Sequence, residues 1–210
     1  MSIKIIRITR FLEIILIFIG LPLLFKFNFI PIHKLIPLLI VFLICLFLLL
    51  IDKSFERKKF GFTSFSGWRV LFIRFFIIAC LSIILVWLFR PESLFIIVRR
   101  NPLLWVLILI FYPIFSAFPQ ELIYRSFFFH RYKIILKNKM LFIFINALLF
   151  SFSHIIFNNW LAIILTFFIS FLFAYTYKKS NSLLVVSLEH ALYGNLIFTV
   201  GIGDFFYLSL

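Results

Sequence analysis

The chain has 210 residues, of which 65% are hydrophobic and only 13% are charged. This is more apolar surface than a soluble domain of that size can bury, so the composition excludes an ordinary soluble protein and indicates an integral membrane protein. The net charge is +14, but the basic residues lie in short clusters between apolar runs. That pattern is typical of loops beside anionic lipid headgroups and argues against a nucleic-acid-binding surface.

Apolar stretches long enough to cross a bilayer predict an all-α, polytopic transmembrane helix bundle with about seven spans. The expected spans, in chain order, are residues 11–29, 35–51, 70–89, 102–118, 140–157, 161–177 and 183–200. The first three form a leading half. A polar, basic loop over residues 52–68 separates the third span from the second.

The N-terminal run predicts an uncleaved first anchor. Lys4, Arg7 and Arg10 precede it, and it ends near Pro22 without a small-residue cleavage site. With the N-terminus in the cytoplasm, most of the 21 basic residues fall in cytoplasmic connections. The positive-inside rule therefore predicts a cytoplasmic N-terminus. The short length leads us to expect the inner (cytoplasmic) membrane of a bacterial cell.

Ionisable residues interrupt the later apolar runs, where each is costly unless it is paired or functional. Glu121 and Arg125 follow Pro119, which favours a kink or a fresh helix start. Their spacing of four places both side chains on one helix face, where the guanidinium can hold the carboxylate ionised. An ordinary ion pair at the membrane interface is the alternative interpretation.

Two further segments carry imidazoles. Phe150 and His154 share a helix face, although a lone buried histidine is more often a hydrogen-bonded core residue than a catalyst. Glu189 and His190 are adjacent and diverge by about 100° on a helix, so one of them is expected to face away from the cavity that holds the other. Glu189 alternatively pairs with a basic residue elsewhere in the bundle, and Gly194 would allow close helix approach.

Polar groups on three separate helices are most simply explained by convergence on one site. A glutamate and two histidines can activate water and stabilise an oxyanion, or they can bind a metal such as zinc as a His₂Glu set. The residue types alone leave both chemistries open.

The order of these motifs resembles the CAAX-protease and bacteriocin-processing (CPBP, also called ABI) family of intramembrane proteases, whose motifs read EExxxR, FxxxH and HxxxN. The corresponding segments here are residues 120–125, 150–154 and 190–195, each in its own apolar run. The resemblance covers roughly residues 103–200. The leading spans are compatible with the family in hydropathy only.

The resemblance implies a bundle of membrane helices around a conical, water-accessible polar cavity in which a glutamate and a histidine activate water. By position, Glu121 and Arg125 match the second glutamate and the arginine of the first motif, and Phe150 matches the phenylalanine of the second. His154 matches the first histidine and His190 the second. We therefore expect Glu121, assisted by His154, to deprotonate a water, and His190 to stabilise the oxyanion.

Two positions depart from the family pattern. Gln120 stands where the family has its first glutamate, and a neutral amide cannot act as a general base. The carboxylate then comes from Glu121, which we favour, or from Glu189, or the protein is not a protease. Asn195 follows His190 by five residues rather than four, so it reaches the cavity only if the helix is locally distorted.

These observations predict two parts: residues 1–101, with membrane helices and a basic cytoplasmic loop, and residues 102–210, a CPBP-like catalytic core. The expected activity is hydrolysis of membrane-associated or prenylated (CAAX-type) substrates, with a bacteriocin, a signal peptide or a surface protein as bacterial candidates. No cofactor is expected, with zinc as the alternative. Competing functions are a non-catalytic immunity or partner-binding protein, which Gln120 favours, and a small transporter, which the lack of an inverted repeat disfavours.

Overall fold

The computed structural model describes residues 3–135 and 138–203, and this part of the chain is helical without a strand. The all-α expectation is therefore confirmed. The expected catalytic part, residues 102–210, includes residues 204–210, which lie outside the described residues.

The first half of the chain forms helices interrupted by short loops. In chain order they are α1 (Ile3–Ile14), the π-helical η1 (Ile15–Gly20), α2 (Leu21–Lys26), α3 (Leu35–Ile51), the 3₁₀ turn η2 (Arg57–Phe60), α4 (Trp68–Phe89), the 3₁₀ turn η3 (Pro91–Ser93) and α5 (Ile96–Arg100). The second half consists of helices joined by shorter connections. They are α6 (Pro102–Tyr112), η4 (Pro113–Ala117), α7 (Phe118–Glu121), η5 (Leu122–Phe127), α8 (Phe128–Arg131), α9 (Lys139–Ser153), η6 (His154–Phe157), α10 (Trp160–Ser180) and α11 (Leu183–Val200).

Within the described residues, six helices are long and apolar enough to cross a membrane, and the shorter apolar helix α3 has 17 residues. Each of the seven expected spans thus has a helical counterpart. Many large apolar side chains on these helices are exposed, as expected of surfaces that face lipid. The protein is accordingly an integral membrane protein built as a polytopic helix bundle.

The helix after Asn101 does not end at Pro119, where the sequence favours a kink or a fresh helix start. Helical backbone continues from Pro102 to Arg131 through Pro113 and Pro119. A proline inside a helix removes one backbone hydrogen bond and crowds the preceding turn. Here the segments η4 and η5 are π-helical, and such wider turns accommodate the disruption without ending the helix.

Polar side chains cap the start of each of the last three long helices. The Asn138 side chain accepts from the Met140 backbone N–H at 2.9 Å, and Asn159 does the same for Leu161 at 2.9 Å. Ser182 accepts from the backbone N–H of the third residue after it at 3.1 Å. These caps satisfy N–H groups at the helix ends and fix where each helix begins.

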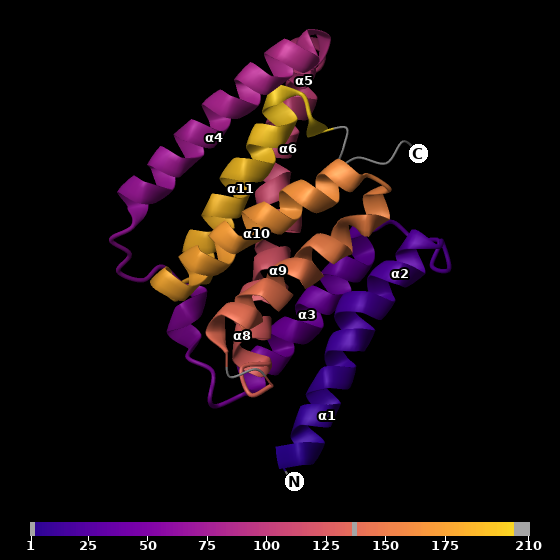
Figure 1. Cartoon of the computed structure of the whole chain (residues 1–210), viewed down its shortest axis with the longest axis vertical. Helices are drawn as coiled ribbons and strands as arrows, with labels where there is room; N and C mark the ends of the chain where they lie inside the picture. The colour runs from indigo at the N-terminus through magenta and orange to yellow at the C-terminus, as the bar shows by residue number, and fades with distance from the viewer. Residues whose placement is uncertain (1–2, 136–137, 204–210) are drawn as a thin grey trace.

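Helices α9, α10 and α11 lie between the α1–α2 rod and α4 in the bundle (Figure 1). Among the candidate spans, α11 has the largest buried share. Phe18 of η1 packs the first rod onto the 102–131 helix, with its ring 5.2 Å from Tyr124, 5.4 Å from Phe128 and 6.0 Å from Tyr132 between centroids.

Candidate active site

A buried ionic cluster joins four helical segments. The Glu121 and Arg125 side chains are fully buried, and Glu121 Oε2 lies 3.1 Å from Arg125 Nε. Arg125 Nη1 also donates to Asn146 Oδ1 of α9, and its Nη2 donates to Ser170 Oγ of α10 at 3.0 Å. Because a buried charge is costly unless it is paired and hydrogen-bonded, these contacts explain how the guanidinium is tolerated inside the bundle.

His190 of α11 joins this cluster through its ring nitrogens. Its Nδ1 lies 2.8 Å from Glu121 Oε1, and its Nε2 lies 3.0 Å from the Tyr112 hydroxyl of α6. A carboxylate only accepts, so Nδ1 carries the proton in the neutral imidazole and Nε2 is then an acceptor. The ring also stacks on Phe173, with centroids 4.6 Å apart, so its orientation is fixed from several directions.

His154 begins the 3₁₀ turn that ends α9. Its Nδ1 lies 2.9 Å from the Phe150 carbonyl oxygen, so Nδ1 is the donor and Nε2 the acceptor in the neutral ring. The Phe150 ring lies 5.0 Å from the His154 ring and 5.8 Å from the His190 ring, and the Arg125 guanidinium lies 5.2 Å from it. Phe150 therefore packs among both imidazoles and the guanidinium.

Two cavities meet at His154. The larger has a volume of about 1250 Å³, and the smaller about 170 Å³. Both are lined by a common set of residues: Lys34, Leu35, Ser116, Gln120, His154 and Phe157. His190 and Tyr112 line the larger cavity. The two histidines thus face the same apolar space, whose walls carry many leucine, isoleucine and phenylalanine side chains.

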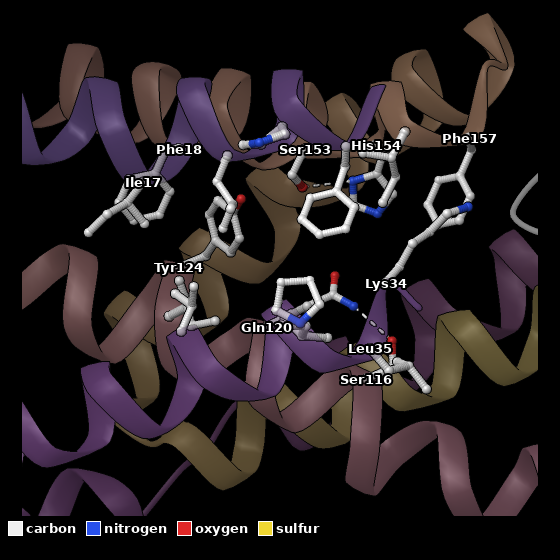
Figure 2. A pocket seen from close by; sticks show the side chains of 18 residues that line it. Ile17, Phe18, Lys34, Leu35, Ser116, Gln120, Tyr124, Ser153, His154 and Phe157 are labelled. Atoms are coloured by element: carbon white, nitrogen blue, oxygen red, sulfur yellow. Dashed lines mark hydrogen bonds between the residues drawn. The ribbon is translucent and has the colours of Figure 1, made fainter. Parts of the chain in front are cut away.

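Gln120 and Glu121 face different surroundings. The Gln120 amide lines both cavities and donates to Ser116 Oγ at 2.8 Å, and Figure 2 shows it reaching with His154 into the smaller pocket. Glu121 is fully buried and is absent from the lining of either cavity in the described part of the chain. Adjacent helix residues point about 100° apart, so the position facing the cavity carries an amide instead of a carboxylate.

The two remaining candidates from the sequence, Glu189 and Asn195, do not line the described cavities. Glu189 is fully buried, and its Oε1 accepts from Arg74 Nη2 of α4 at 2.8 Å, so it has the basic partner considered from the sequence. Arg74 also donates to Thr176 Oγ1 at 3.2 Å. The Asn195 amide donates to the Leu109 carbonyl at 3.3 Å and does not line the described cavities. Glu189 and Asn195 therefore belong to helix-packing contacts.

Three residues of the site were not identified from the sequence. Asn146 was identifiable, since an amide in an apolar helix is the same kind of signal as His154. Ser170 and Tyr112 carry no such signal, because serine and tyrosine are common in membrane helices. Within the described residues, no group of three His, Cys, Asp or Glu side chains is arranged to hold a metal ion.

The fold and the site define a polytopic membrane protein with a histidine-lined apolar cavity beside a buried ionic cluster. Residues 102–196 match the family model described as type II CAAX prenyl endopeptidase Rce1-like. This segment carries all three motifs, and the match confirms the resemblance to CPBP proteases. No curated protein and no solved structure matches the chain.

At the level of the family, the match supports a CAAX-type intramembrane endopeptidase, which is a hydrolase. A membrane-associated substrate and a lipid environment follow from that class and from the long apolar helices.

Proposed function

We propose that the protein hydrolyses a peptide bond of a membrane-associated or prenylated (CAAX-type) substrate bound in the larger cavity. The observation that carries this proposal is the wall shared by the two cavities, where His154, Gln120 and Ser116 border an apolar space of about 1250 Å³. The apolar lining suits a prenyl or other lipid-like chain, and the polar wall provides groups that can act on a peptide bond.

His154 is the proposed general base, in place of the expected Glu121. Its Nε2 takes a proton from water, and the resulting hydroxide oxygen forms a bond with the scissile carbonyl carbon while the C=O electron pair moves onto oxygen. When the tetrahedral intermediate collapses, the C–N bond breaks and His154 returns its proton to the leaving amine. The hydrogen bond from Nδ1 to the Phe150 carbonyl holds the tautomer that this step requires.

Glu121 and Arg125 are proposed to position His190 rather than to contact substrate. The Glu121 carboxylate bridges His190 Nδ1 and Arg125 Nε at 2.8 and 3.1 Å. This arrangement fixes the imidazole on the oxyanion side of the cavity, and Arg125 compensates the carboxylate charge in the buried interior of the bundle.

We also propose a cytoplasmic N-terminus in a bacterial inner membrane. The clustering of basic residues in the connections that lie on the N-terminal side supports this orientation through the positive-inside rule.

The direct test uses purified protein in micelles with peptides that end in a prenylated cysteine motif, and cleavage is followed by mass spectrometry. Cleavage of the prenylated peptide, and not of its unprenylated counterpart, is expected. If the folded protein binds these peptides but cleaves none, the function is non-catalytic binding on the same scaffold, which the amide at position 120 favours.

Gln120→Glu is expected to raise kcat by about 10-fold to 100-fold, because it adds a cavity-facing carboxylate that can accept a proton beside His154. The side chains have nearly the same shape, so packing is retained. Gln120→Leu is the control, since it has similar size without a proton acceptor. A Gln120→Glu protein that is folded yet no faster than wild type would contradict the assignment of this wall as the site of water activation.

Complete removal of divalent metal ions is expected to leave turnover unchanged, because the proposed steps use side chains alone. The measurement compares peptide cleavage before and after chelation, with metal content checked by mass spectrometry. A loss of turnover that Zn²⁺ restores would instead support metal-assisted hydrolysis.

A further inference from the structure

The Tyr112 side chain fills the space directly beside the backbone of Gly194. Gly194 lies where the family's third motif has its asparagine, one turn after His190 on α11. A Cβ atom added to Gly194 would overlap with the ring and the hydroxyl of Tyr112, which comes from α6. The tyrosine therefore fills the space that a side chain at position 194 would need, and glycine is the residue that permits it.

The Tyr112 hydroxyl also occupies a functional position. It lies 3.0 Å from His190 Nε2, and both residues line the larger cavity together with Gly194. Asn195, the nearest amide in the sequence, instead donates to the Leu109 carbonyl and is absent from the described lining. The polar group beside His190 in the cavity is thus a phenol from another helix.

His190 by itself is a poor oxyanion donor in its neutral form. Its Nδ1 proton is directed to Glu121, so Nε2 accepts, and an acceptor cannot stabilise a developing negative charge. The Tyr112 O–H can donate. If Nε2 is protonated, it donates to the Tyr112 oxygen and leaves the phenol proton available for substrate. When Nε2 is unprotonated, the single phenol hydrogen is directed to it at 3.0 Å, so the hydroxyl presents its proton to the cavity when both ring nitrogens of His190 are protonated.

We propose that Tyr112 is a catalytic residue that donates its hydroxyl hydrogen bond to the oxyanion, replacing the asparagine of the third motif. This inference rests on the proposed function. The donation leaves the phenol protonated, so no bond to its hydrogen breaks. The rings of Phe198 and His190, with centroids 5.7 and 6.1 Å from that of Tyr112, pack against the phenol and hold it in place.

The kinetic test is Tyr112→Phe, which removes only the hydroxyl. We expect kcat to fall by about 10² to 10³, as for loss of one oxyanion donor, with KM nearly unchanged. Tyr132→Phe is the matched control. Tyr132 is also buried, its hydroxyl has no hydrogen-bond partner within the described residues, and it lines neither cavity. Its loss of a hydroxyl should leave turnover unchanged.

A binding test does not depend on turnover. A prenylated phosphinate peptide mimics the tetrahedral oxyanion, and a ketomethylene peptide of the same sequence keeps a planar carbonyl. Wild type is expected to prefer the phosphinate, and Tyr112→Phe should lose that preference while binding the ketomethylene equally well. A change in structure alone would weaken binding of both peptides.

The third test exchanges the two positions. Tyr112→Ala together with Gly194→Asn returns the amide to its family place and should recover part of the turnover and phosphinate preference lost in Tyr112→Ala. Gly194→Asn alone should be impaired because of the overlap with Tyr112.

The outcomes separate this inference from the proposed function. A phosphinate preference that depends on Tyr112 in a protein that cleaves nothing supports the inference and overturns water activation by His154. A preference that survives Tyr112→Phe overturns the inference, whether or not wild type cleaves. A wild type that binds neither peptide overturns both.

Discussion

His154→Ala is expected to lower kcat by about 10² to 10⁴, the usual contribution of a positioned general base. His154 lines both cavities, and its Nδ1 is held by the Phe150 carbonyl at 2.9 Å. The remaining nitrogen is the proton acceptor of the neutral ring, so removing the imidazole removes the step that generates hydroxide. KM should change little, because the apolar lining that binds the substrate is unaltered.

The control for this prediction is His130→Ala. The His130 imidazole lies outside both cavities and contacts Asp52 Oδ2 at 2.9 Å, so its loss should leave kcat unchanged. His154→Gln tests the base further, since the amide retains a polar group of similar reach but cannot take the proton. Cleavage by His154→Gln at the wild-type rate would remove His154 from the role of base.

The sequence predicts the spans well because their signal is physical and local. A bilayer imposes a minimum length of apolar helix, and each expected span has a helical counterpart in the structure. The rule that intramembrane charges require partners also led to Glu121, Arg125, His190 and Glu189, all of which have ionic or hydrogen-bonded partners.

Which of Gln120 and Glu121 faces the cavity could not be predicted, because the sequence determines only the angle of about 100° between adjacent side chains on a helix. The rotation of the whole helix is set by packing against its neighbours. The π-helical segments η4 and η5 on either side of α7 change that rotation further, and a proline indicates disruption without giving its form. The amide at position 120 therefore faces the cavity while the carboxylate joins the buried cluster.

The contact of Tyr112 with His190 could not be predicted either, because it joins α6 and α11 across 78 residues of sequence. From the sequence, only Gly194 on α11 indicated such a contact. Its lack of a side chain predicts close helix approach, but which residue fills the space is a property of the tertiary fold.

Arg125→Met is expected to destabilise the folded protein by about 3 to 5 kcal/mol, the usual effect of breaking a buried ion pair. The side chain is fully buried and contacts Glu121, Asn146 and Ser170, so its loss leaves three polar groups without their cationic partner. Methionine retains much of the volume, which separates the electrostatic effect from a cavity effect. Denaturant unfolding in micelles, followed by tryptophan fluorescence, gives the free energy.

Two further variants assign that loss to the Glu121 carboxylate. Arg125→Met with Glu121→Gln should be more stable than Arg125→Met alone, because the second change removes the uncompensated buried charge. Arg100→Met is the control, since Arg100 is exposed and its change should stay within about 0.5 kcal/mol. If the double variant is less stable than Arg125→Met, the carboxylate is stabilised chiefly by His190. The His190–Glu121 pair, rather than the guanidinium, would then hold the site together.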